Sequence, residues 1–330
     1  MDTLSTYLSN WRLKLSVAKT MSSAFHLNNR EASRELNIIV NNNRLQFQAT
    51  PTYLGVKLDR TLTYRQHLGN VSAKTSARVA LIRRLAGTTW GASTKTLRIS
   101  TQALVFSAAE YCAPVWCRST HTKKLDITLN NALRTVSGCL RATLVNQLPI
   151  LAGIAPPSLR REAAILALSH KATNDDNHLL YKTATEIPHR ARLKSRRPFK
   201  EHVHQLLCSV PPDISKRLWL KRCWTEEWQT ADHSRLHRFL DEPGELLGED
   251  LPRKQWTMLN RLRTSVGRFA ATMKGWGLRD SAACDCGHPE QSVDHIIESC
   301  PQHRPPHGEH NIITLDADTK TWLFSTKLQV

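Results

Sequence analysis

The first 60 residues alternate apolar and polar positions in short runs, which is the period of half-buried β-strands. This alternation predicts a strand in residues 11–20, and residues 36–48 place three asparagines between two apolar runs. Asparagine tolerates the left-handed turn conformation, so the second pattern predicts a hairpin. Residues 52–59 predict another short strand, and residues 2–10 one short helix. We therefore expect the edge of a sheet in this region.

From residue 62 onwards the apolar period becomes helical. The pattern predicts helices over residues 62–86, 93–113 and 121–137, with Pro114 and Gly138 following the last two. Lysines and arginines occupy the other faces of these helices. The three helices should form one basic all-α unit.

The middle of the chain is broken by proline, glycine and charge. Residues 149–157 are rich in proline and glycine and indicate a boundary, after which a helix resumes at residues 158–172. Residues 189–200 are crowded with lysine and arginine and have no apolar period, which is typical of a linker or an exposed arm.

The last predicted helix covers residues 252–276 and is amphipathic. Its apolar stripe faces one way, while Lys254, Arg261 and Arg268 recur every seven residues on another face. One side should therefore pack while the other stays cationic. Residues 302–330 are polar and are expected to be loosely ordered, with one short strand or helix at the end.

The overall charge points to a class of partner. The 330 residues include 46 lysines and arginines against 28 acids, a net charge of +18 that is spread along the whole chain. A polyanion is the natural partner of such a protein. No apolar run approaches the ~18 residues that span a bilayer, and no signal-peptide pattern is present. We therefore expect an intracellular protein of the nucleus or cytoplasm, with RNA and DNA as partners and no membrane partner; the oligomeric state is unknown.

Three of the eight cysteines crowd into one segment near the C-terminus. Cys284, Cys286, His295 and Cys300 follow the spacing C-x-C-x8-H-x4-C, which provides a full tetrahedral ligand set for Zn²⁺. A site with four protein ligands has no open position for water, so it would fold a small lobe rather than catalyse. The alternative is accidental adjacency in a loop, and His288 or His303 could replace one of the four ligands.

Other candidate sites have simpler interpretations. Cys112 and Cys117 lack further ligands at a suitable spacing and are expected to be packed thiols. Asp175 and Asp176 lie among asparagines in a predicted solvated loop rather than on the rigid support that metal-dependent phosphoryl transfer needs.

Two sets of residues could contact nucleic acid directly. Leu220, Trp224 and Trp228 form a stripe that could stack on unpaired bases beside Lys221 and Arg222, or pack against a neighbouring helix. The basic helices could contact phosphates or present a merely solvated charged face. The predicted phosphate contacts are Lys74, Arg78, Arg261 and Arg268.

Together, these segments resemble the downstream half of non-LTR (LINE-type) retrotransposon reverse transcriptases, especially the jockey-like group. WRLKLSVAKTMSSAF resembles the palm segment that follows the catalytic hairpin, and PTYLGVKLDRTLTYRQHL resembles the primer-grip turn and the start of the thumb. Residues 77–116 are similar to the thumb. LNRLRTSVGRF and the Cys/His segment resemble the zinc-knuckle-like end of these proteins. The likeness covers roughly residues 1–145 and 250–301.

The resemblance implies roles for particular residues. Tyr53, Leu54 and Gly55 would form the primer grip, and Lys19 would be the candidate general acid that protonates the leaving pyrophosphate. The family's catalytic aspartates precede this region, yet residues 1–58 contain one aspartate, Asp2. No catalytic triad is therefore complete in this chain, and Mg²⁺ would be a cofactor of the full-length enzyme alone. We expect a truncated element that begins at an internal methionine.

The expected fold is α+β and mostly α-helical. The expected segments are a palm edge with a primer-grip-like turn (1–60), a helical thumb (61–145), a basic helical connector (146–248), a basic helix with a zinc-stapled lobe (249–305) and a tail (306–330). The predicted function is template-primer binding by part of an RNA-directed DNA polymerase that is inactive alone. A non-enzymatic zinc-dependent nucleic-acid-binding protein and a non-functional remnant are the alternatives, which salt-dependent binding separates.

Overall fold

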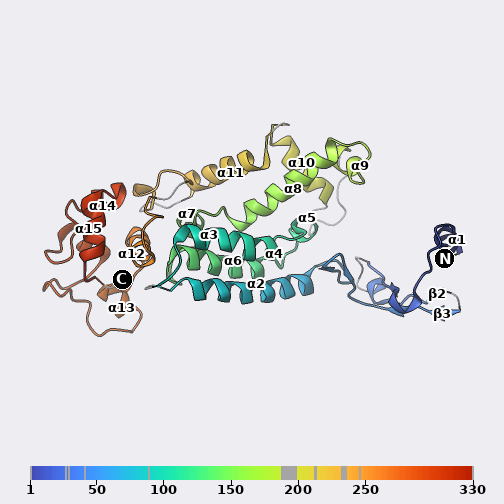
Figure 1. Ribbon diagram of the computed structural model, residues 1–330, viewed down its shortest axis with the longest axis horizontal. Helices are drawn as coiled ribbons and strands as arrows, with labels where there is room; N and C mark the ends of the chain where they lie inside the picture. Colours follow the sequence, from blue (N-terminus) through green and yellow to red (C-terminus); the bar gives the residue numbers. More distant parts are fainter. Residues whose placement is uncertain are drawn as a thin grey trace. The chain divides into compact units, whose positions relative to one another are not determined.

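The computed structural model describes residues 2–26, 28, 30–40, 42–87, 90–186, 199–211, 214–231, 236–244 and 247–328. Residues 189–198 of the predicted basic arm lie outside the described residues. The described chain is mostly helical with a few short strands, which confirms the predicted class (Figure 1). None of the described helices is both long and apolar enough to cross a membrane.

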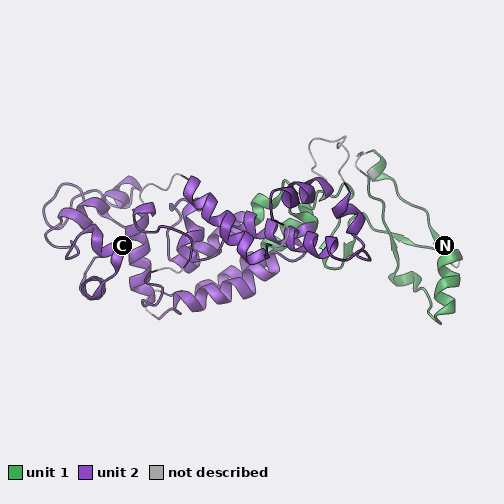
Figure 2. Ribbon diagram, turned by 90° about the horizontal axis from the view of Figure 1, so that it is seen from above, with its two compact units in different colours: residues 1–73, 115–125 green, residues 74–114, 126–330 purple. Residues whose placement is uncertain are grey.

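The chain divides into two compact units (Figure 2). Unit 1 comprises Met1–Ala73 and Val115–Leu125, and unit 2 comprises Lys74–Pro114 and Asp126–Val330. The division into five segments stays a prediction.

Unit 1 contains all the described strands. Its elements before the first long helix are α1 (Asp2–Asn10), η1 (Val17–Lys19), β1 (Met21–Ser22), η2 (Glu31–Ser33), β2 (Ile39–Val40), β3 (Asn43–Arg44), β4 (Gln46–Phe47), β5 (Thr52–Tyr53) and β6 (Val56–Lys57). The helices α2 (Arg65–Leu85) and α6 (Thr122–Ser137) begin in unit 1 and continue into unit 2, and α5 (Ala113–Trp116) spans the other boundary.

The strands form three separate pairs rather than one sheet edge. Strand β2 pairs antiparallel with β3, and Asn42 between them has a φ of +58°, so the predicted asparagine hairpin is confirmed. Strand β1 pairs in parallel with β4. The strand predicted within residues 11–20 is wrong, because the described backbone there ends in the 3-10 helix η1. Alternation alone does not make a strand, since the backbone N–H and C=O groups also need a partner, and β4 pairs with residues 21–22 instead.

Unit 2 is built from helices. Beyond α2 they are α3 (Thr94–Thr101), the π-helical turn η3 (Gln102–Phe106), α4 (Ser107–Ala109), η4 (Val145–Gln147), α7 (Leu148–Ala152), α8 (Pro157–Thr173), α9 (Tyr181–Thr185), α10 (Phe199–Cys208), α11 (Lys216–Thr230), η5 (Leu236–Arg238), α12 (Arg253–Thr264), α13 (Ala270–Gly275), the π-helical turn η6 (His295–Ser299), α14 (Glu309–Thr314) and α15 (Ala317–Ser325). The helices predicted from residues 62, 93 and 121 are therefore present with slightly different bounds.

The helical period accounts for the packing of these helices. In α6, Leu129, Leu133 and Val136 are fully buried and lie on one face, at the i, i+4 and i+7 positions that a helical core stripe requires. Helix α8 packs against α9, α10 and α11. The core between α8 and α11 contains Leu166 and Trp219.

The prediction of one helix over residues 252–276 is wrong. Helix α12 ends at Thr264 because Ser265 adopts a left-handed conformation with φ +56°, and α13 starts only at Ala270. The break places Phe269 in a fully buried position. It also lets the Ala270 N–H donate to the Gln291 side-chain oxygen at 2.9 Å.

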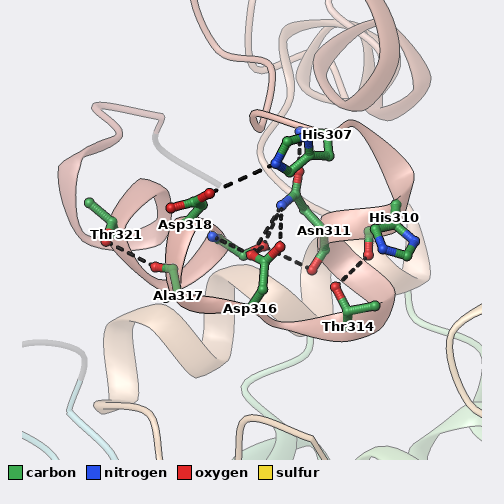
Figure 3. A network of polar contacts seen from close by, with 9 residues as sticks. His307, His310, Asn311, Thr314, Asp316, Ala317, Asp318 and Thr321 are labelled. Atoms are coloured by element: carbon green, nitrogen blue, oxygen red, sulfur yellow. Dashed lines mark hydrogen bonds and ion pairs between the residues drawn. The ribbon is translucent and has the colours of Figure 1, made fainter.

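The tail is more ordered than expected, because it forms two packed helices rather than one short element at its end. Helices α14 and α15 pack against each other and against α12. Figure 3 shows the polar network that joins the two tail helices. Asn311 and Thr319 are both fully buried, and the Asn311 amide donates to the Thr319 hydroxyl at 2.7 Å. Asp316 caps α15 by accepting from the Thr319 N–H at 2.8 Å.

Candidate functional site

The four residues of the predicted metal motif meet in one cluster. The ligand atoms of Cys284, Cys286, His295 and Cys300 all lie within 4.8 Å of one another. The sulfurs of Cys284 and Cys300 are 3.8 Å apart, and the Cys286 sulfur is 3.2 Å from His295 Nε2. With Zn–S bonds of about 2.3 Å, two sulfurs on one tetrahedral ion are about 3.8 Å apart. The cluster could therefore hold a tetrahedral metal ion.

Local backbone geometry brings these side chains together. Gly287 has a φ of +91°, which turns the chain directly after Cys286. The Cys284 N–H donates to the His288 carbonyl at 2.9 Å and closes the loop. His295 begins the π-helical turn η6, whose end places Cys300 opposite Cys284.

Neighbouring side chains orient the ligands. His295 Nδ1 lies 3.1 Å from the Ser299 hydroxyl, so this contact keeps the ring's Nε2 directed at the cluster. His288 stacks on His295 with ring centroids 4.1 Å apart, while its Nδ1 accepts from the Glu290 N–H at 3.2 Å. Neither His288 nor His303 belongs to the four-residue cluster.

The electrostatics of the cluster suit metal binding in two positions and oppose it in one. Burial opposes ionisation of Cys284, yet hydrogen bonds from Cys286 and Gln291 bring its pKa below the usual value. Burial lowers the pKa of His295, the nearby His288 and His303 lower it further, and the neutral imidazole that binds metals is thereby favoured. Burial raises the pKa of Cys300, whose thiol would release its proton only on metal binding.

The predicted primer-grip triplet forms the tip of a hairpin. Strands β5 and β6 pair antiparallel, and Leu54 and Gly55 between them have φ values of +46° and +82°. Two consecutive positive φ values make a tight two-residue turn. Tyr53 and Leu54 are 66% and 72% exposed, so the tip presents two large apolar side chains to solvent. Lys19 is exposed at the end of η1.

The four predicted phosphate contacts have different surroundings. Lys74 and Arg268 are exposed. Arg78 is half-buried and donates to the Leu104 carbonyl at 2.6 Å, and Arg261 is half-buried and donates to the Gly138 carbonyl at 3.2 Å.

Most of the cationic character of α12 is used inside the protein. The last carbonyls of a helix lack intrahelical donors and carry partial negative charge. At the end of α6, Arg253 donates to the carbonyls of Thr135 and Val136, and Asn260 donates to that of Ser137 at 2.9 Å. Burial lowers the pKa of Arg253 to about 10, which leaves it protonated at neutral pH. Arg253, together with Asn260, therefore caps the C-terminal end of α6.

Unit 1 contains a cationic basin that the sequence did not reveal. Its volume is about 1240 Å³, and its cationic lining residues are Arg60, Arg65, Lys123 and Lys124. Within the described lining, Asp59 is the single acidic residue, and its carboxylate accepts from Thr63 N–H at 2.7 Å and hydroxyl at 2.8 Å. Among the residues that the structure describes, none of the four cations forms an ion pair with an acid.

Two long helices begin at the wall of this basin. Arg65 is the first residue of α2, and Thr122 is the first of α6, so the first turns of both helices line the cavity. Helix N-termini carry partial positive charge from their free N–H groups. Arg60 and Arg65 lie almost 60 residues before Lys123 and Lys124 in the sequence. The sequence signal for this site was therefore limited to the two adjacent lysines at the start of a predicted helix.

The rival sites show no comparable arrangement. Cys112 and Cys117 are half-buried, and the described part of the chain contains no other metal-like cluster than the one above. Asp175 accepts from the Asn177 N–H at 3.0 Å in an exposed loop. Of the predicted stripe, Trp228 is buried, whereas Trp224 and Leu220 are half-buried.

Three curated proteins are similar to this chain. A 115 kDa protein of the type-1 retrotransposable element R1DM from Drosophila melanogaster is 25% identical over 76% of the chain. Pol polyproteins from R1 elements of Bradysia coprophila and Nasonia vitripennis are each 22% identical over 82% of it. The chain spans 23%, 26% and 64% of the lengths of these three relatives. No family model and no solved structure matches the chain.

Proposed function

Because this chain is a relative of the proteins of R1 non-LTR retrotransposable elements, we propose that it is the nucleic-acid-binding, downstream part of an R1-type reverse transcriptase. In this proposal the chain holds the template and primer strands inside the cell, in the nucleus or cytoplasm, while other segments supply the catalytic aspartates. The hairpin tip Tyr53–Gly55 touches the primer, and exposed cations touch phosphates.

The cationic basin of unit 1 carries this proposal. Four cations without acidic partners in the described chain repel one another, and a phosphate backbone relieves that repulsion. The N-terminal ends of α2 and α6 add partial positive charge. The basin's 1240 Å³ exceeds the roughly 300–1,000 Å³ of small-molecule pockets, which favours a polymeric anion.

The test is a binding titration with a short primed RNA template at several salt concentrations. Charge reversal at two basin lysines, Lys123→Glu with Lys124→Glu, should weaken binding at least tenfold, because two phosphate contacts become repulsive. The matched control is Lys320→Glu with Lys327→Glu, which changes the net charge equally at exposed lysines of unit 2. Equal losses in both variants would contradict the basin as the binding surface.

We also propose that the Cys284/Cys286/His295/Cys300 cluster binds Zn²⁺ as a structural ion. All four positions are filled by protein atoms, so zinc would join the loop after Cys284 to the turn η6 without catalysing. Zinc content should be one ion per chain and should fall in Cys300→Ser. Chelation should expose the backbone amides of residues 282–300 to hydrogen exchange while those of α6 stay protected; a zinc-free protein with protected amides there would contradict the proposal.

A polymerase assay distinguishes template-primer binding from DNA synthesis. The chain should extend no primer on an RNA template with Mg²⁺, because residues 1–58 contain a single aspartate. Extension would contradict the account of the missing carboxylates. Absence of RNA and DNA binding even at low salt would instead favour a non-functional remnant over the zinc-dependent binding protein.

A further inference from the structure

A second cavity, in unit 2, differs chemically from the basin. Its volume is about 540 Å³, within the roughly 300–1,000 Å³ range of pockets that hold a small organic group. Its walls come from α6, the turn η4, the starts of α7 and α8, and α11. Its described lining residues include no lysine or arginine, although the protein carries a net charge of +18. A phosphate therefore has no counterion there.

Flat and apolar groups dominate the walls. Pro149, Pro156 and Pro157 lie on the side of α7 and α8, and Trp224 and Trp228 lie on the side of α11. Trp228 is buried, and its indole N–H donates to the Asp241 carbonyl at 3.2 Å. Trp224 is only half-buried and lines the cavity, so a planar group in the cavity could stack on its ring.

The polar groups of the cavity have spare hydrogen-bonding capacity. Asp126 is already bound by Arg161 through two hydrogen bonds of 2.5 and 3.1 Å. The side chains of Glu227, Asn130 and Asn146 form no hydrogen bond or ion pair with any other residue that the structure describes. Burial raises the pKa of Glu227, since no cation offsets the loss of water around its carboxylate.

This set of groups favours one kind of ligand. An aromatic face with hydrogen-bonding groups around it recognises an unpaired nucleobase by stacking and by contacts to the base edge. Guanine presents two adjacent donors, N1–H and the N2 amino group, and one carboxylate can accept from both. Uracil presents a single N–H between two carbonyl oxygens, which a carboxylate repels.

We propose that this cavity binds an unpaired guanine base, which stacks on Trp224 and donates from N1–H and the N2 amino group to Glu227. The amides of Asn130 and Asn146 are donors for the remaining acceptors, O6 and N7, of the base. The inference rests on the proposed function, because phosphate contacts outside the cavity hold the rest of the strand.

The test compares five uridine decamers that differ at one central position, which carries guanosine, inosine, adenosine, cytidine or uridine. The full chain should bind the guanosine decamer about tenfold more tightly than the uridine decamer, the scale of discrimination by one bidentate pair of hydrogen bonds. Inosine, which lacks the N2 amino group, should fall between them. Trp224→Ala and Glu227→Gln should each remove the preference, whereas Trp224→Phe should keep part of it because a smaller ring remains.

Titration with guanosine monophosphate tests the cavity without the strand. It should quench tryptophan fluorescence of the wild type, uridine monophosphate should not, and the quenching should be absent in Trp224→Phe. If all five decamers bind equally with a steep salt dependence, the guanine site is wrong while the proposed function stands. If no decamer binds at low salt, the proposed function is wrong, and the mononucleotide titration then decides the cavity. A preference that survives both Trp224→Ala and Glu227→Gln places guanine recognition elsewhere and overturns the inference.

Discussion

The cations of the basin in unit 1 and those of α12 in unit 2 are the same residue types used in opposite ways. Arg60, Arg65 and the two lysines at 123 and 124 line an open cavity without acidic partners in the described chain. Arg253 and Arg263 are at most 6% exposed and donate to backbone carbonyls of their own unit. A run of basic residues in the sequence therefore does not reveal whether its positive charges bind phosphate groups or carbonyls of the protein itself.

The physical difference lies in the backbone that each set meets. The basin lies at the N-terminal ends of α2 and α6, where the helix dipoles add positive charge. Helix α12 meets the C-terminal end of α6, where unsatisfied carbonyls attract cations. One helix, α6, thus has an anion-attracting end and a cation-attracting end.

The largest effect should come from removing a cap. Arg253→Ala leaves the buried Thr135 and Val136 carbonyls without this donor and should lower the free energy of unfolding by about 3 kcal/mol. The adjacent, exposed Lys254→Ala should change it by less than about 0.5 kcal/mol. Chemical denaturation of both variants measures the difference, and equal values would erase the distinction between the two regions.

Neutralising the lysines of the basin should change nucleic-acid binding and leave the stability of the protein unchanged. Lys123→Gln with Lys124→Gln should reduce the slope of log affinity against log salt by about 2, because two phosphate contacts are lost. The free energy of unfolding of this double variant should stay within about 0.5 kcal/mol of the wild-type value, since both lysines are exposed. A loss of stability with an unchanged salt slope would assign these lysines a structural role.

Arg261 and Arg268 belong to the same set of predicted phosphate contacts, but the first is half-buried and the second is exposed. Arg261→Ala should lower the free energy of unfolding by about 1 kcal/mol, because the hydrogen bond to Gly138 is lost. Arg268→Ala should leave stability nearly unchanged and reduce the salt slope by about 1 if this exposed side chain touches a phosphate. Thermal unfolding and binding titrations of both variants distinguish the two roles.

The smallest effect concerns a carboxylate that lacks a cation. Burial raises the folded-state pKa of Glu227 above 4.5, and the charge of Glu227 contributes to the raised pKa of Glu162. The folded state therefore binds more protons than the unfolded state, and stability increases as the pH falls through the folded-state pKa. Glu227→Gln should flatten this dependence and stabilise the protein at pH 7 by at most about 0.5 kcal/mol, because the carboxylate is only partly buried and solvent screens it. Unfolding measured between pH 4.5 and 7 tests the sign.

Several features were determined by short stretches of sequence alone. The helical period located α2, α6 and α8, because an apolar stripe repeats over neighbouring turns. The asparagine turn at Asn42 needed only a residue that tolerates positive φ. The four residues of the Cys/His cluster lie within seventeen positions, so their spacing was enough to bring them together.

Other features depended on contacts between distant segments, which only the tertiary structure decided. Helix α12 ends at Thr264 although its apolar period continues, because the packing of Phe269 and the contact of Ala270 with Gln291 redirect the chain. Arg253 became a cap because the end of α6 lies against it, more than 110 positions earlier in the sequence. Periodicity records which face of an element is buried, but the partner of each charge is chosen by whichever backbone or side chain the fold brings beside it.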